Sequence, residues 1–300
     1  EETVVAEAAD CPVADVLLNL QTAVVINLQR RPDRMSRCAE RLRAHCPWLR
    51  FERFDASDGQ RDAISMNEVA NSWDTSRNTV YQRLRAKRKG WADEGSYIER
   101  RLDLSPGERG CSLSHIRAWR HCLEHCGSTQ RPLLVLEDDA DPTCNFSAVL
   151  ARALHALPPD AHLLYLGYSQ AAEWRCELSP ELVRSEYVWT TVAYLVWPAG
   201  ARILLSRLPI DQPADNWLAG LCADGTINAY CVRPKIVHQA DAWNVNSDVC
   251  HSDEHYWGPS ADSNICHSDC FYWGSATCLS NETGLGRDSN IHHSDEHYWR

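Results

Sequence analysis

An apolar segment that ends in three consecutive acids places the strongest constraint on the fold of this chain. Residues 132–136 read Pro-Leu-Leu-Val-Leu, and Glu137, Asp138 and Asp139 follow directly. The apolar run is typical of a strand that is buried on both faces, and ionised groups at the edge of a core are costly unless a partner compensates them. Ligands of open α/β sheets bind beyond the carboxyl ends of the strands, where these acids fall. The segment therefore predicts a site for a divalent cation, with a solvated acidic turn as the open alternative.

Strand and helix patterns alternate along the chain around this segment. Residues 22–28 form a short β-branched apolar run that predicts a buried strand. Ser105, Pro106 and Glu108 have the spacing of a capping box, which predicts a helix start. The remaining expected elements are strands over residues 49–54, 132–138, 161–168, 188–197 and 227–237, and helices that begin at Pro32, Asn145, Pro198 and Pro213. This alternation predicts an α/β fold with a mostly parallel central sheet flanked by helices.

Length and charge narrow the classes of function. With 300 residues the chain can bury a sizeable core in one large domain or two smaller ones. Its formal net charge of -11 argues against non-specific binding to nucleic acid. No apolar run reaches the roughly 18 residues of a membrane span. No Gly-x-Gly-x-x-Gly motif follows the first expected strand, which argues against a dinucleotide-binding enzyme.

Cysteine content and glycosylation sequons bear on the compartment. The chain contains 14 cysteines, which is many for a reducing cytosol. Two sequons occur, Asn145-Phe146-Ser147 and Asn281-Glu282-Thr283. Together they favour the lumen of the endoplasmic reticulum or Golgi, with the cytoplasm as the open alternative.

Four motifs follow one another along the chain, namely residues 25–34 (VINLQRRPDR), 51–59 (FERFDASDG), 107–115 (GERGCSLSH) and 136–140 (LEDDA), with weaker ones at 213–215 and 237–239. In this order and at these distances they resemble glycosyltransferase family 25. That family includes lipooligosaccharide galactosyltransferases of bacteria and procollagen galactosyltransferases of animals. The likeness covers about residues 22–245 and leaves the C-terminal part outside.

The resemblance implies a nucleotide-sugar-binding α/β fold of the type called GT-A and an inverting transfer of a hexose to a hydroxyl group. It implies a UDP-sugar donor, usually UDP-galactose, and a divalent cation, usually Mn²⁺, with Mg²⁺ as the alternative. The acceptor stays open between a glycan, a hydroxylated protein and a lipid-linked sugar.

The acid triplet stands where the family has an Asp-x-Asp motif that binds the metal. Asp139 is therefore the expected main metal ligand, with Asp138 and Glu137 in support. Because a glutamate is longer by one methylene, Glu137 is also expected to reach the donor's ribose or a water molecule. The triplet reads Glu-Asp-Asp here, so the match to the family's motif is incomplete.

An inverting transfer needs a general base opposite the leaving group, and two carboxylates are candidates for this catalytic role. Asp215 lies just inside an expected helix start, and Glu108 belongs to the expected capping box. Asp215 also has a structural alternative, because an acid in the first turn of a helix interacts favourably with the helix dipole. The pattern leaves the choice between the two residues open.

Polar side chains at the expected strand ends and helix starts are candidate donor contacts, since a planar guanidinium suits a phosphate group. The candidate donor-binding residues are Asn27, Arg30, Arg34, Asp55, Asp58, His115, Glu137 and Asp138. His238 follows the last expected strand and is a further candidate metal ligand. The alternative for His115 and His238 is packing within the fold, and for the arginines it is solvation of a helix face.

The resemblance implies a glycosyltransferase domain over residues 22–245. An N-terminal segment over residues 1–21 precedes it, and composition marks a Cys/His/Trp-rich tail over residues 246–300. Residues 60–104 are polar and predict no definite element. The tail contains three similar segments, at residues 247–257, 263–273 and 289–299. Histidines four residues apart in two of these copies would bind Zn²⁺ or Cu²⁺ if they lay on a helix, and irregular, partly disulfide-linked loops are the alternative.

Three hypotheses about function follow. The first is a metal-dependent glycosyltransferase, which the intact acids at 137–139 favour. The second is a non-catalytic carbohydrate- or nucleotide-binding relative that kept the fold. The third makes the tail the working part, as a metal- or surface-binding module on an inert scaffold.

Overall fold

The computed structural model describes residues 20, 23–90, 97–240 and 247–249 of the chain. All of them belong to the first of two compact units, Glu1–Glu254, and the second unit, His255–Arg300, lies wholly outside the described residues. The predicted histidine clusters of the tail and nearly all of the N-terminal segment therefore fall outside the description. Within it, no helix combines the length and the apolar character needed to cross a membrane.

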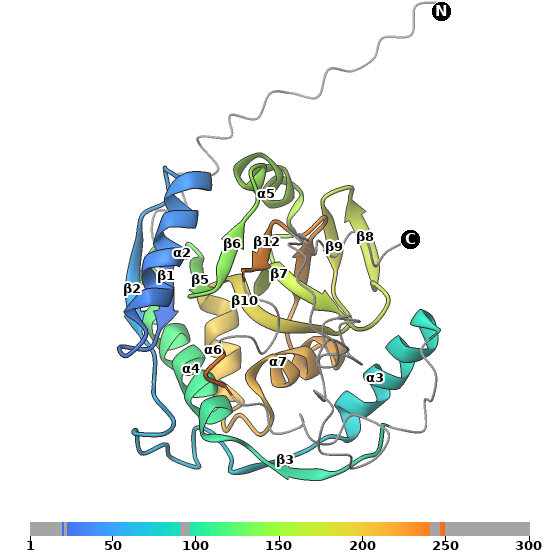
Figure 1. Cartoon of the computed structure of the whole chain (residues 1–300). Coiled ribbons are helices and arrows are strands. Elements are labelled where there is room, and N and C mark those ends of the chain that lie inside the picture. Colours follow the sequence, from blue (N-terminus) through green and yellow to red (C-terminus); the bar gives the residue numbers. More distant parts are fainter. Residues whose placement is uncertain (1–19, 21–22, 91–96, 241–246, 250–300) are drawn as a thin grey trace, which may run out of the picture. The chain divides into compact units, whose positions relative to one another are not determined.

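A mixed sheet of eight strands forms the centre of the described part (Figure 1). Its strands, in spatial order, are β2 (Phe51–Asp55), β1 (Ala23–Asn27), β5 (Leu133–Glu137), β10 (Val188–Val196), β7 (Leu163–Gln170), β11 (Ala229–Val232), β9 (Leu182–Arg184) and β8 (Cys176–Ser179). The pairings give six of these described strands one common direction, and only β10 and β9 run against it. The predicted α/β class with a mostly parallel sheet is confirmed, and the arrangement is consistent with a GT-A-like fold.

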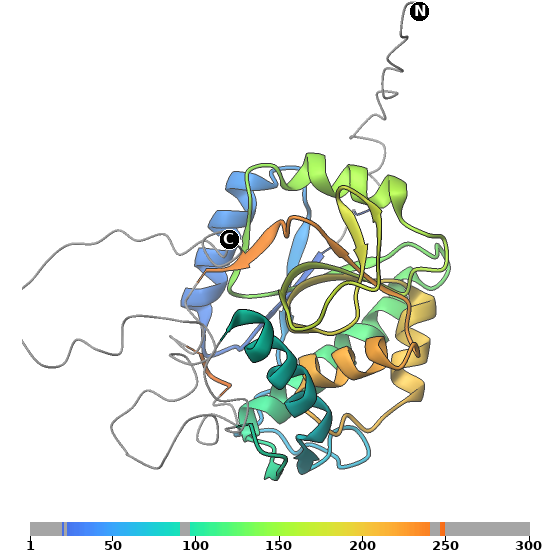
Figure 2. The same cartoon turned by 90° about the vertical axis from the view of Figure 1, so that its right-hand side faces the viewer.

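Helices cover both faces of this sheet, and two hydrophobic cores result. Val24 faces one core and the next residue, Val25, faces the other, because successive side chains of a strand point to opposite faces. In Figure 2 the light-green α5 lies on one side of the strands and the orange α7 on the other. The helices are α2 (Pro32–His45) and α5 (Phe146–Ala156) on the Val25 side, and α4 (Pro106–Cys126), α6 (Pro198–Ser206) and α7 (Ala214–Ala223) on the Val24 side.

The predicted helix starts are confirmed, and the capping box of α4 is complete. The Ser105 hydroxyl accepts a hydrogen bond from the Glu108 backbone N–H at 3.1 Å, and the Glu108 carboxylate accepts one from the Ser105 N–H at 2.7 Å. Two backbone donors that a helix start leaves unpaired are thereby satisfied. This local chemistry fixes where α4 begins, at the wall of the site described below.

Several regions differ from the sequence-based expectation, and β8 and β9 are two strands that it did not include. The single strand predicted over residues 227–237 is wrong, because β11 ends at Val232 and a separate strand, β12 (Val237–Gln239), pairs with β6 (Ala140–Pro142). Pro234 lies between them, and a proline has no N–H to donate to a strand ladder. Residues 60–104 hold three elements that the pattern did not predict, namely β3 (Ser72–Asp74), α3 (Ser76–Lys89) and β4 (Arg101–Asp103).

A glycine contact holds the loop that follows β2 against the start of α4. A Cβ atom on Gly59 would lie 1.6 Å from the Pro106 carbonyl oxygen, and one on Gly110 would lie 2.6 Å from the Ser57 carbonyl oxygen. Only residues without a side chain allow two backbones to approach this closely. The contact brings the loop after β2 beside α4.

We expect Gly59→Ala to lower the free energy of unfolding by about 3 kcal/mol, because the methyl group would force two backbone segments apart. Urea denaturation followed by circular dichroism measures this change. Arg61→Ala is the matched control, since the Arg61 side chain belongs to the same loop and is 72% exposed. A loss for Gly59→Ala no larger than that of the control would contradict the close contact.

Candidate active site

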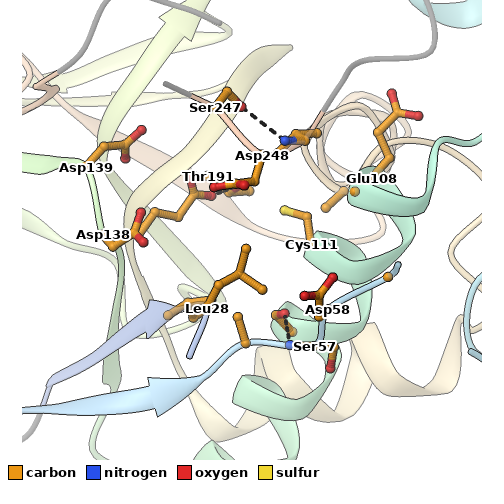
Figure 3. Close-up of a pocket in the computed structure, with 18 of the residues that line it drawn as sticks. Leu28, Ser57, Asp58, Glu108, Cys111, Asp138, Asp139, Thr191, Ser247 and Asp248 are labelled. Carbon is orange, nitrogen blue, oxygen red and sulfur yellow. Dashed lines mark hydrogen bonds between the residues drawn. The ribbon is translucent and has the colours of Figure 1, made fainter. Parts of the chain in front are cut away.

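A cavity of about 190 Å³ opens beyond the carboxyl ends of β1 and β5, the position expected for a ligand of an α/β sheet. The ends of these strands, the loop after β2, the first turns of α4 and α7, a bulge in β10, and β12 all contribute to its wall. Figure 3 shows Asp138 and Asp139 on one side of this cavity, with Asp58 and Cys111 across from them. Distant parts of the chain therefore build one site.

The cavity wall is strongly acidic. Among its described lining residues, two guanidinium groups, those of Arg30 and Arg34, face seven carboxylates. The carboxylates are Asp58, Glu108, Glu137, Asp138, Asp139, Asp215 and Asp248. Mutual repulsion among like charges in a partly enclosed space raises their free energy, and a bound cation relieves it.

Asp139 is the acid of the triplet whose charge the protein compensates least. Its buried Oδ1 has no hydrogen-bond partner, and its Oδ2 lies 3.4 Å from the Gln239 amide nitrogen and 3.4 Å from an Arg34 nitrogen. Burial, together with the neighbouring charge of Glu137, raises the pKa of Asp139 to about 7. A buried carboxylate oxygen without a donor is the group that a hard cation would bind.

Asp138, by contrast, is held by neighbouring side chains. The Asn27 amide donates to its Oδ2 at 2.7 Å, and the Arg34 Nε donates to its Oδ1 at 2.6 Å. Burial opposes the charge on Arg34, but the hydrogen bond and charge of Asp138 raise the pKa of Arg34 above its ordinary value. Asn27 is buried behind the acids and does not line the cavity, so its role is to orient Asp138.

Glu137 is the outermost member of a series of hydrogen-bonded side chains that continues into the core through His115 and Tyr194. Its Oε1 accepts a hydrogen bond from the Thr191 hydroxyl at 2.5 Å and lies 3.3 Å from His115 Nε2. Since an ionised carboxylate only accepts, Nε2 carries the proton, and Nδ1 can accept from the Tyr194 hydroxyl at 2.8 Å. Burial raises the pKa of Glu137, but the contacts with His115 and Thr191 outweigh it, and the net pKa lies below the ordinary value.

His115 therefore orients Glu137 and does not itself line the cavity. Cys111, one helical turn earlier on α4, does line it and was missed by the sequence reasoning. The ligand atoms of Cys111, His115 and Glu137 lie within 4.8 Å of one another. The contact of His115 Nε2 with Glu137 explains the proximity of these two residues without a metal, and Cys111 is near them because it lies one helical turn from His115.

Asp215 lies at the first turn of α7 and holds a strained backbone position. Its Oδ2 accepts a hydrogen bond from the Thr190 N–H at 3.1 Å, and its Oδ1 accepts one from the Asn216 N–H at 2.7 Å. Thr190 has φ 73°, where a β-branched residue is strained, and it lies in the bulge of β10. Strain of this kind persists where the surrounding structure holds it, commonly at functional sites. Asp215 and Thr190 both line the cavity.

The other candidates lie in different surroundings. Glu108 lines the cavity, but its carboxylate turns back to cap α4. Asp55 is largely exposed, pairs with Arg53 and does not line the cavity, so the structure does not support its predicted donor contact. His238 does not line it either. The next residue on β12, Gln239, points into the site instead, because neighbouring side chains of a strand alternate in direction.

Arg30 pairs with two acids of the cavity wall. Its Nε donates to Asp58 at 2.9 Å, and its Nη1 donates to Asp248 at 2.5 Å. Burial raises the pKa of Asp58, but the hydrogen bonds from Arg30 and from the Gln60 N–H, together with the charges of Arg30 and Arg61, outweigh it. The net pKa of Asp58 lies below the ordinary value. Asp248 follows the expected domain boundary, and no local sequence signal pointed to it.

The residues at this site fit a hard divalent cation. The donor set around Asp139 consists of carboxylate oxygens, which suit Mg²⁺ or Mn²⁺ better than soft metals. The orphaned oxygen of Asp139 is the observation on which this fit rests. His238, predicted as a fourth ligand, does not line the cavity with this set.

Comparison with known proteins agrees with the fold and the acid motif. The family model "Glycosyltransferase family 25 (LPS biosynthesis protein)" matches residues 20–218, about two thirds of the chain. The chain belongs to glycosyltransferase family 25.

Individual relatives are similar at modest identity. The chain is 27% identical over 254 residues to a glycosyltransferase 25 family member of Anopheles gambiae, covering 75% of this chain and 38% of the relative. It is 35% identical over 123 residues to the inactive glycosyltransferase 25 family member 3 of Homo sapiens, and 35% over 124 residues to the procollagen galactosyltransferase 1-B of Xenopus laevis. Each of the latter two matches covers 38% of this chain and 20% of the relative. The chain thus spans well under half of these relatives' length.

Proposed function

We propose that the chain is a metal-dependent, inverting glycosyltransferase that moves a hexose from a UDP-sugar to a hydroxyl group. The observation that carries the proposal is the buried, unpartnered Oδ1 of Asp139 in an acidic cavity at the ends of β1 and β5. A nucleoside diphosphate is itself an anion and would be repelled by this wall. A divalent cation held by Asp139, with Asp138 beside it, would allow the negatively charged diphosphate to bind next to this acidic wall.

When bound, the cation would neutralise the charge that develops on the departing diphosphate. Arg30 and Arg34, the two guanidiniums of the wall, would bind the phosphate oxygens. In the transfer the acceptor oxygen bonds to the anomeric carbon while the bond from that carbon to the diphosphate breaks. Asp215 is the favoured base for the acceptor's proton, because it lies in the cavity wall beside the strained Thr190, whereas the Glu108 carboxylate turns back to cap α4.

Galactose is the favoured sugar. The support is the name of the Xenopus laevis relative, a procollagen galactosyltransferase, which matches 38% of this chain. The same name favours a hydroxylated protein as acceptor over a glycan. A choice between galactose and glucose turns on one or two polar contacts within the cavity, so the donor has to be measured.

The second candidate function is a non-catalytic relative that kept the fold. The human relative with 35% identity is named as inactive. Its match to this chain extends over 123 residues, and that of the Xenopus laevis galactosyltransferase extends over 124. The acids of residues 137–139 and Asp215 are all present and line the cavity in this chain, which favours the active alternative. The third hypothesis concerns tail residues that lie almost wholly outside the described part.

A panel of nucleotide sugars tests the proposal. The chain is incubated with UDP-galactose, UDP-glucose or UDP-N-acetylglucosamine, with Mn²⁺ or with EDTA, and released UDP is measured. We expect UDP release above the protein-free background with UDP-galactose and Mn²⁺, and none with EDTA. Absence of turnover with every donor, with and without a hydroxylated-peptide or glycan acceptor, would favour the non-catalytic alternative.

We also propose that the chain works in the lumen of the secretory pathway. Asn145 of the first sequon is exposed just before α5, so a glycan could be attached to the folded chain. The nine cysteines in the described part of the chain are all free, so the support comes from the sequon and not from disulfides.

A further inference from the structure

Three residues beyond the expected domain boundary form part of the cavity wall. Ser247, Asp248 and Val249 all line the cavity, and Figure 3 shows Ser247 and Asp248 among its side chains. The sequence-based division assigned them to the tail. Two of these residues, Asp248 and Val249, make direct contacts with the domain.

The backbone of Val249 is attached to the start of α4. The Ser105 hydroxyl donates a hydrogen bond to the Val249 carbonyl oxygen at 2.8 Å. The Val249 backbone also packs directly on Gly107, where a Cβ atom would lie 2.1 Å from the same oxygen. Gly107 thus leaves room for this segment, and the capping residue of α4 binds it.

The carboxylate of Asp248 bridges two arginines of the loop between β1 and α2. Its Oδ1 accepts from Arg30 Nη1 and its Oδ2 accepts from Arg31 Nη1, each at 2.5 Å. The Asp248 side chain is 22% exposed, so these charge-assisted hydrogen bonds are shielded in part from water. Asp58 holds Arg30 Nε from its other side at 2.9 Å.

We propose that Asp248 is a positioning residue of the transferase site. Two carboxylates, those of Asp58 and Asp248, fix the guanidinium plane of Arg30 by accepting hydrogen bonds from its Nε and its Nη1. Arg30 is thereby held in the cavity wall in an orientation that lets it donate a hydrogen bond to an oxygen of the donor's diphosphate. This inference rests on the proposed function, because it assigns Arg30 to the donor of that reaction.

The charge of Asp248 is the property that matters for this role. A carboxylate can accept from two guanidiniums at once, whereas an amide has one accepting oxygen. The two later copies of the segment carry Asn264 and Asn290 at the corresponding position, so the first copy alone has the acid. The geometry therefore predicts that asparagine cannot replace Asp248 in the first copy.

The experiment compares full-length variants in steady-state kinetics with a UDP-sugar and Mn²⁺. We expect Asp248→Asn to raise the KM for the donor about tenfold, with kcat changed less than threefold and the acceptor KM unchanged. Asp248→Glu keeps the charge and should recover most of the donor affinity. Gly107→Ala should raise the donor KM by a similar factor, because its methyl group would displace Val249 without altering any charge.

Asp33→Asn is the matched control. Asp33 also pairs with Arg31, but its side chain is 54% exposed and lies outside the cavity wall. Its donor KM should stay within twofold of that of the unchanged chain. Binding of UDP with Mn²⁺, measured by calorimetry, should weaken in Asp248→Asn by the same factor as the KM rises.

The outcomes separate this inference from the proposed function. A wild-type chain that turns over no nucleotide sugar and binds no UDP would overturn both. An active wild type whose Asp248→Asn variant keeps its donor KM, or loses only thermal stability, would overturn the role of Asp248 alone. A lower donor KM in Asp248→Asn would show that Asp248 competes with the donor and would likewise refute the positioning role.

Discussion

Asp139→Ala should reduce sugar transfer by roughly 10³-fold, because a catalytic cation contributes several kcal/mol to the stabilisation of the transition state. Asp139 is the acid of the triplet whose buried oxygen lacks a hydrogen-bond partner, so it is the carboxylate best placed to bind the cation. Released UDP, measured at saturating Mn²⁺, gives the rate, and calorimetry gives the affinity for Mn²⁺. Both should fall together.

Asp141→Ala is the matched control for this change. Asp141 lies two residues further on, in β6, where its side chain is 41% exposed and does not line the cavity. The rate of sugar transfer and the Mn²⁺ affinity of the Asp141→Ala variant should match those of the unchanged chain. Normal turnover by Asp139→Ala in Mn²⁺ would exclude Asp139 as the essential ligand.

The pH dependence of Mn²⁺ binding supplies a further check on the same residue. Burial and the charge of Glu137 raise the pKa of Asp139 to about 7 in the metal-free chain, so a proton competes with the cation below that pH. The Mn²⁺ affinity should therefore fall between pH 8 and pH 6. Asp139→Asn has no proton to release at this position, so its residual affinity should lose most of that dependence.

Asp215→Asn should lower kcat by about 10²–10⁴-fold, the usual contribution of a general base. Asparagine keeps an oxygen that can accept the hydrogen bond of Thr190 or Asn216, so the bulge of β10 is disturbed little. The amide cannot take a proton from the acceptor hydroxyl. The effect should therefore fall on kcat, while the donor KM and the thermal midpoint change little.

Asp211→Asn, at an exposed position just before α7, should leave kcat unchanged and serves as the control. Asp215→Ala separates the chemical from the structural role. It removes the acceptor of the Thr190 N–H, which holds Thr190 at its positive φ, and the acceptor of the Asn216 N–H. The variant should therefore have a lower thermal midpoint as well as a lower kcat. If Asp215→Asn keeps its kcat, the base lies elsewhere, and Glu108 is then the next residue to replace.

Several site residues were predictable because their signal is local. The strand before the acid triplet, the proline that opens α2 and the capping box of α4 each depend on residues within a few positions of one another. Such patterns act through backbone sterics and short-range hydrogen bonds, which the sequence specifies directly. They placed Glu137, Asp138 and Asp139 at the cavity, together with Arg34 of α2 and Glu108 of α4.

Other assignments failed because a strand end does not reveal which way a side chain points. His238 and Gln239 are neighbours on β12, and only Gln239 lines the cavity. The pairing of β12 with β6 sets this register, and it joins segments about a hundred residues apart. Asp55 likewise follows a predicted strand but stays at the surface beside Arg53.

The sequence by itself determined the α/β class, the family and the acid motif, since local pattern and motif order suffice for these. Tertiary structure alone decided which acid lacks a partner and which residues orient the others. Asn27 reaches Asp138 across 111 positions, and Asp248 reaches Arg30 across 218. The energy of a charge depends on the groups that folding brings near it, and no local spacing encodes those neighbours.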